Sequence, residues 1–253
     1  KNNDLFKDTP IINLHFNEIL LMTKGDKKYF NSLKYILHNE KGEYTYTELY
    51  SLHNILQSYA TKHFLEGNSG FEKEKMSLYK LAMFKEILIY PFQNIIDANQ
   101  FLSAVNISLS AGEITWAEKF INEYKDHTHK EINKILVDLC FAKICYVNGN
   151  IEEAQKFLGD IKTKSTDILI NIKTLQLKIY YDRSLFIEAG LVTDSFRHLL
   201  SKLEKTAASV IFESYKNFIN YYSMLIKAKE KMKKENVFEL LQTLKKKKVT
   251  QER

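Results

Sequence analysis

The sequence contains few residues that interrupt helices: only two of its 253 residues are proline and only eight are glycine. Proline removes a backbone donor and glycine lowers helix propensity, so their scarcity favours helices over a fold made of turns and short strands. No uncharged apolar run reaches the roughly 18 residues expected of a membrane-spanning helix. The sequence therefore predicts a helical protein without a membrane span.

Cysteine is also scarce, since Cys140 and Cys145 are the only two. Five residues apart on a helix, they lie on different faces and cannot easily bridge each other. They also lack the CxxC spacing of redox and zinc sites. We interpret them as two buried thiols in a reducing compartment, which favours a cytoplasmic location. The sequence begins at Lys1 and shows no signal-peptide pattern at this end. We interpret the chain as a fragment whose native targeting is unknown.

Charge is concentrated at one end of the sequence. Residues 227–253 hold ten basic and four acidic side chains, which accounts for the whole net charge of +6. The remaining residues are neutral overall, so a general affinity for nucleic acid or anionic membranes is not expected of them. Only the C-terminal segment has a basic bias.

Apolar residues recur with helical period along nearly the whole chain. Hydrophobic residues make up 45% of the sequence and aromatic residues 13%, which is enough to form a core. Connectors of a few residues between such helices predict antiparallel hairpins. About twelve helices are expected, over residues 10–23, 27–39, 45–65, 71–89, 95–110, 113–125, 129–147, 150–162, 166–182, 184–203, 206–230 and 234–247.

A repeat is visible in the middle of the chain. In ICYVNGNIEEAQKFL, Gly149 is followed five residues later by Ala154. Gly112 and Ala117 repeat this spacing 37 residues earlier, and Ala189 recurs 35 residues later with Ser184 at the glycine position. A glycine can end a helix in the left-handed conformation, and a small residue lets the next helix approach closely. Each unit is therefore predicted to be a hairpin that stacks on its neighbours.

These residues resemble the tetratricopeptide repeat over about residues 95–200, through Ala142, Tyr146, Gly149 and Ala154 and their equivalents. Trp116 sits in the second helix of its unit, and the proline that usually ends each unit is absent, so the resemblance is to a degenerate form. WAEKFINEYK and LQLKIYYD also resemble stretches of bacterial repeat proteins, from which no function follows. The resemblance implies an all-α solenoid of about six antiparallel hairpins, one array over 1–253 that is most regular at about 95–203.

The resemblance also implies which side chains line a concave, partner-binding face. Asparagine and lysine there would suit a peptide backbone or a carboxylate, and tyrosine offers apolar area with a hydroxyl group. The alternative is that these are ordinary exposed residues of half-polar helices. The implied contact residues are Asn99, Leu102, Asn106, Lys143, Tyr146, Asn171, Lys178 and Tyr181.

A second basis for binding is the lysine run Lys245, Lys246, Lys247 and Lys248, which could contact phosphates of nucleic acid or of a membrane surface. Its structural alternative is a solvated helix end, where lysines complement the helix dipole. Nucleotide-binding, GxSxG and HExxH patterns are absent from the sequence. We therefore expect a non-enzymatic scaffold without metal or cofactor that binds a protein, a peptide or the remainder of its own longer chain.

Overall fold

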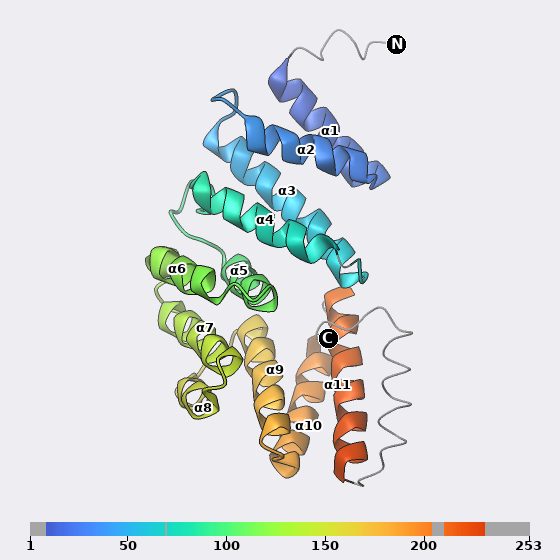
Figure 1. The fold of residues 1–253 in the computed structure, drawn as a ribbon, viewed down its shortest axis with the longest axis vertical. Helices are drawn as coiled ribbons and strands as arrows, with labels where there is room; N and C mark the ends of the chain where they lie inside the picture. Colours follow the sequence, from blue (N-terminus) through green and yellow to red (C-terminus); the bar gives the residue numbers. More distant parts are fainter. Residues whose placement is uncertain (1–8, 69, 204–209, 231–253) are drawn as a thin grey trace. The chain divides into compact units, whose positions relative to one another are not determined.

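The computed structural model describes residues 9–68, 70–203 and 210–230. In this part of the chain the protein is all-α, with eleven α-helices and one short 3₁₀ helix (Figure 1). Outside the helices, one isolated bridge joins Tyr90 and Ile95. None of the described helices has the length and apolar character to cross a membrane. The expected helix over 234–247 and the lysine run Lys245–Lys248 lie outside the described residues.

The chain divides into two compact units. Unit 1 comprises residues 1–64 and 69–129, and unit 2 comprises residues 65–68 and 130–253. The helices run in this order: α1 (Pro10–Lys24), α2 (Lys27–Asn39), α3 (Tyr46–Leu65), α4 (Gly70–Phe84), α5 (Ala98–Ser110), α6 (Ile114–Tyr124), η1 (Lys125–His127), α7 (Asn133–Val147), α8 (Ile151–Gly159), α9 (Thr166–Asp182), α10 (Phe186–Leu203) and α11 (Val210–Glu230).

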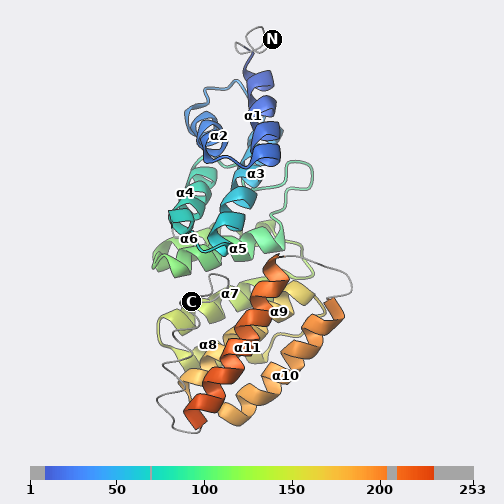
Figure 2. The same ribbon diagram turned by 90° about the vertical axis from the view of Figure 1, so that its right-hand side faces the viewer.

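Consecutive helices lie side by side within each unit. In unit 1, α1 lies beside α2 and α5 beside α6 (Figure 1). Helix α3 is joined to α4 by a hydrogen bond from the Gln57 amide to the carbonyl of Lys75. Phe30, Leu52 and Phe101 are fully buried there, one on each of α2, α3 and α5. In unit 2, α7 packs on α8, α9 contacts both of them, and α10 packs on both α9 and α11 (Figure 2). Phe196 and Ile219 are central to its apolar cluster.

The turn at Gly149 has the predicted geometry. Gly149 is left-handed at φ 79°, and its N–H donates to the carbonyl of Tyr146 at 3.0 Å. The next N–H, of Asn150, donates to the carbonyl of Cys145 at 2.8 Å. This is the Schellman pattern, in which two otherwise unpaired carbonyls at the helix end are satisfied. The hairpin α7/α8 is therefore closed by the residue that the sequence singled out.

The same turn occurs at the two positions that the repeat aligns with Gly149. Gly112 has φ 74° and Ser184 has φ 56°, and both show the same donor and acceptor spacing as Gly149. Five residues after each turn the alanine is fully buried, at Ala117, Ala154 and Ala189. The predicted combination of left-handed turn and small buried residue is confirmed for all three hairpins.

Helix α4 ends earlier than expected, at Phe84 rather than near residue 89. Glu86 is left-handed at φ 57°, and the N–H of Ile87 donates to the carbonyl of Ala82 at 2.9 Å. This is a fourth turn of the same kind, and a glutamate such as Glu86 does not predict a left-handed conformation. The expected helix start near residue 95 was also wrong, because Asp97 caps α5 by accepting hydrogen bonds from two following N–H groups.

Helix α1 begins at Pro10, as predicted. Further helix boundaries differ from those expected. Helix α7 begins at Asn133 instead of residue 129, because residues 125–127 form the 3₁₀ helix and Thr128 is extended. Helix α8 ends at Gly159, three residues before its expected end.

Candidate functional site

The predicted contact residues of unit 2 lie on the first helices of two hairpins, α7 and α9. Lys143 and Tyr146 are on α7, whereas Asn171, Lys178 and Tyr181 are on α9. The Nζ atom of Lys143 donates a hydrogen bond to Oδ1 of Asn171 at 3.0 Å. Asn171 in turn donates to the carbonyl of Asp167 at 2.9 Å, one turn earlier on α9. The structure thus brings two of the predicted residues together and fixes both.

A second link between α7 and α9 involves a residue that the sequence reasoning missed. The hydroxyl of Tyr146 donates to Oδ2 of Asp182 at 2.7 Å. A hydroxyl bound to a carboxylate is a charge-assisted hydrogen bond, which is stronger than a neutral one. Asp182 directly follows Tyr180 and Tyr181 at the end of α9. This position next to two tyrosines was the only sequence signal for its contact with Tyr146.

Tyr181 joins α9 to α11. The Nζ atom of Lys229 lies 4.2 Å from the centroid of the Tyr181 ring, within range of a cation–π interaction. The Tyr222 ring packs edge-on against Tyr181, with centroids 6.4 Å apart. The Tyr222 hydroxyl donates to the carbonyl of Leu177 at 2.6 Å, which anchors α11 on α9. Burial raises the pKa of Tyr222, and so do nearby Tyr181 and Asp182, which keeps the phenol protonated.

We call the residues Lys143, Tyr146, Asn171, Lys178, Tyr181 and Lys229 the α7–α9–α11 face. Tyr146 and Tyr181 are both half-buried, so part of each ring is held by the protein and part is open to solvent. Lys229 is exposed. Lys229 belongs to the basic C-terminal segment of residues 227–253, whose sequence does not predict a contact with Tyr181. Side chains of three helices therefore combine aromatic surface with lysine charge.

The remaining predicted contact residues belong to unit 1. Asn99 and Asn106 are exposed on α5. Leu102 is only 2% exposed, so in this structure its side chain fills the interior and is not available to a partner. Its position follows from the period of α5, where Phe101, Leu102 and Val105 all face inward.

The described residues contain no group of three or more His, Cys, Asp or Glu side chains that could hold a metal ion. His127, one of two closely spaced histidines, lies against the carbonyl of Asn94, with 3.4 Å between Nδ1 and the oxygen. Burial raises the pKa of the Cys140 thiol to about 12, so this cysteine stays protonated and unreactive at neutral pH. Glu152 and Glu153 lie in the first turn of α8, where acids favour the positive helix end.

No protein-family model matches this chain, and neither a curated protein nor a solved structure matches it. The resemblance to the tetratricopeptide repeat thus rests on the residues quoted above.

Proposed function

We propose that this protein is a degenerate tetratricopeptide-like solenoid that acts as a non-enzymatic scaffold. Support comes from three hairpins that share one turn geometry at Gly112, Gly149 and Ser184 and one buried alanine after each turn. A hairpin that repeats in this way buries its second apolar face by stacking, and stacked hairpins expose an extended surface formed by their first helices.

The proposed binding surface is the α7–α9–α11 face, and the partner is a protein or peptide. The observation that carries this proposal is Tyr181, a half-buried ring flanked by Lys229 at 4.2 Å and by Tyr222. A tyrosine whose ring is fixed by its neighbours loses little entropy on binding, and interface energy is concentrated in such residues. Lys143, Lys178 and Lys229 would orient a peptide carbonyl or carboxylate.

The test is affinity capture from native lysate with the wild type and with Tyr181→Ala, each with and without nuclease and at two salt concentrations. Tyr35→Ala, which removes a tyrosine 70% exposed on α2, is the matched control. We expect a defined protein partner that survives nuclease and moderate salt, is retained by Tyr35→Ala and binds Tyr181→Ala about 1–2 kcal/mol more weakly. Equal binding by both variants, with helical circular dichroism intact, would remove Tyr181 from the site.

The same experiment tests the alternative, association with nucleic acid or an anionic membrane through Lys245–Lys248. Binding to phosphates releases counterions, so it falls steeply as salt rises. Recovery of only nucleic acid or lipid, lost at moderate salt and unaffected by Tyr181→Ala, would replace the scaffold proposal with this one.

A further inference from the structure

The turn between α7 and α8 contains Asn148 followed by Gly149, the only Asn–Gly pair in the sequence. Both residues are exposed, so water reaches them. Asparagine is a chemically labile residue, because the next backbone nitrogen can attack its side-chain amide carbon. Glycine hinders this attack least, since it has no Cβ atom beside the nitrogen. The pair therefore supplies both reactants of a modification within the chain.

The reaction has two steps. The Gly149 nitrogen forms a bond to Cγ of Asn148 and gives up its proton, while the side-chain nitrogen leaves as ammonia, so that a five-membered succinimide ring remains. Water then adds to one of the two ring carbonyl carbons and breaks its bond to nitrogen. Opening at one carbonyl gives aspartate. Opening at the other gives isoaspartate, in which the main chain runs through the side-chain carbons.

The folded turn holds the reacting atoms apart. Asn148 has ψ 0°. Because Cα is tetrahedral, this angle leaves the Gly149 nitrogen about 120° of rotation away from the Cβ atom of Asn148, whereas the five-membered ring requires the two atoms to be nearly eclipsed. Asn148 must therefore rotate about its Cα–C bond before the ring can close.

Two hydrogen bonds oppose this rotation. The Gly149 N–H lies in the peptide plane that has to turn, and it donates to the carbonyl of Tyr146 at 3.0 Å. The N–H of Asn150 donates to the carbonyl of Cys145 at 2.8 Å. Rotation at Asn148 breaks the first of these bonds and displaces the second. The hairpin has to open at its turn before the reaction can begin.

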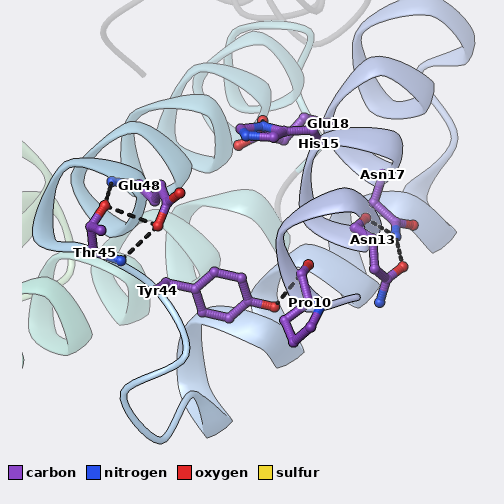
Figure 3. A network of polar contacts seen from close by, with 8 residues as sticks. All are labelled: Pro10, Asn13, His15, Asn17, Glu18, Tyr44, Thr45 and Glu48. Carbon is purple, nitrogen blue, oxygen red and sulfur yellow. Dashed lines mark hydrogen bonds and ion pairs between the residues drawn. The ribbon is translucent and has the colours of Figure 1, made fainter. Parts of the chain in front are cut away.

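Two other asparagines provide references within the same chain. Asn150 is also exposed in this turn, but the β-branched side chain of Ile151 hinders the nitrogen that would attack it. Asn17 lies inside α1, where its amide nitrogen donates to the carbonyl and to Oδ1 of Asn13, both at 2.8 Å (Figure 3). Neither combines an accessible turn with a following glycine.

We propose that Asn148 is a deamidation site that the closed α7/α8 turn suppresses and that opening of this hairpin activates. The substrate is the chain itself, and water is the co-reactant. The proposal does not depend on a partner of the α7–α9–α11 face, so the two proposals succeed or fail independently.

The modified turn closes less readily than the original one. Aspartate places a negative charge at the C-terminal end of α7, where the helix dipole is negative as well. Isoaspartate adds one carbon to the main chain between the Tyr146 carbonyl and the Asn150 N–H, so the hydrogen bonds of the turn lose their register. Each reacted chain thus keeps a permanent record that its α7/α8 hairpin has opened.

The experiment is incubation of the whole chain at neutral pH, both folded and in urea above its unfolding transition, followed by peptide mapping with mass spectrometry. Chromatography separates the aspartate and isoaspartate products. Asn150→Pro removes the N–H that bonds to Cys145, at a residue whose φ of −84° lies close to that of proline. Asn150→Ala keeps this N–H and is the matched control. Far-UV circular dichroism reports whether each variant is folded.

We expect Asn148 of the wild type to react at least about tenfold more slowly when folded than in urea, because both hydrogen bonds of the turn must open. Asn150→Pro should accelerate the folded reaction about fivefold, the scale of one lost hydrogen bond, while Asn150→Ala leaves it unchanged. In urea the three proteins should react at one rate and form isoaspartate. Asn17 should react far more slowly than Asn148 throughout.

Three results would overturn the proposal. If Asn148 does not react in urea, it is not a deamidation site. If the folded wild type reacts as fast as the unfolded chain, the turn does not suppress the reaction. If folded Asn150→Pro and Asn150→Ala react at the same rate, the hydrogen bonds of the turn do not control it. Should Asn150→Pro fail to fold, the comparison of folded and unfolded wild type decides.

Discussion

Gly149 and Gly190 both have open space where a Cβ atom would stand, yet the same substitution should affect them in opposite directions. No heavy atom lies within 4 Å of the Cβ position at either residue, so backbone conformation decides the outcome. Gly149 has φ 79°, where an L side chain is strained, whereas Gly190 lies inside α10. We expect Gly149→Ala to lower the free energy of unfolding by ~1 kcal/mol and Gly190→Ala to raise it by ~0.5–1 kcal/mol.

Urea unfolding followed by circular dichroism measures both changes. Ser184→Gly provides the reciprocal control, because Ser184 occupies the same turn at φ 56° with a side chain and should gain stability when that side chain is removed. Equal effects of Gly149→Ala and Gly190→Ala would contradict the role assigned to the left-handed turn.

At the scale of elements, α3 and α4 enclose His53, from which we expect a pH dependence of the stability of unit 1. His53 is fully buried on α3, and its Nδ1 atom has no hydrogen-bond partner in the described part of the chain. The amide Nε2 atom of Gln57 lies 3.4 Å from His53 Nε2 and also donates to the carbonyl of Lys75 on α4 at 3.2 Å. Burial lowers the pKa of His53 to about 4, below the ordinary value of 6.5.

Because the folded His53 stays neutral down to about pH 4 while the unfolded chain takes up a proton below 6.5, stability is lost as pH falls through this window. Between pH 7.5 and 5.5 the free energy of unfolding should drop by about 1 kcal/mol from this residue. Urea unfolding of wild type, His53→Gln and His38→Gln at both values checks it. The slope should shrink in His53→Gln and persist in His38→Gln, whose histidine is exposed on α2. An unchanged slope in His53→Gln would assign the pH dependence to other groups.

The elements also show which parts of the fold the sequence could reveal. The glycines at positions 112 and 149 predict left-handed turns, and the repeat spacing correctly extended this prediction to Ser184. Glu86 adopts the same conformation without such a signal, so the end of α4 was placed too late. Its conformation depends on the hydrogen bonds that Ile87 and its neighbours make after the helix, which no residue type encodes locally.

At the scale of the whole molecule, the candidate site was only partly predictable. Helical spacing and the repeat alignment placed Lys143 and Asn171 on helices that the fold brings together. Asp182 and Lys229 became visible only in space, since their contacts with Tyr146 and Tyr181 join residues of different helices. Leu102 shows a different failure. Alignment to a repeat identifies a helix position but does not show whether the side chain there is buried or exposed, and Leu102 is buried.

The proposal of one continuous solenoid predicts that the two units unfold together. Stacked repeats stabilise one another through nearest-neighbour interfaces, so a defect in one hairpin weakens the others. The sequence contains a single tryptophan, Trp116, which lies on α6 of unit 1 and stacks on Phe120 with centroids 5.3 Å apart. Ala154 is fully buried on α8 of unit 2, where a leucine side chain would overpack the core and cost about 1–3 kcal/mol.

We therefore expect Ala154→Leu to lower the urea midpoint reported by Trp116 fluorescence along with the midpoint reported by far-UV circular dichroism. Ala117→Leu, at the equivalent buried position of α6, is the positive control and must lower the tryptophan midpoint directly. If Ala154→Leu leaves the tryptophan curve in place while circular dichroism splits into two transitions, the units unfold separately. The chain would then consist of two helical domains, each stabilised by its own core, rather than one array.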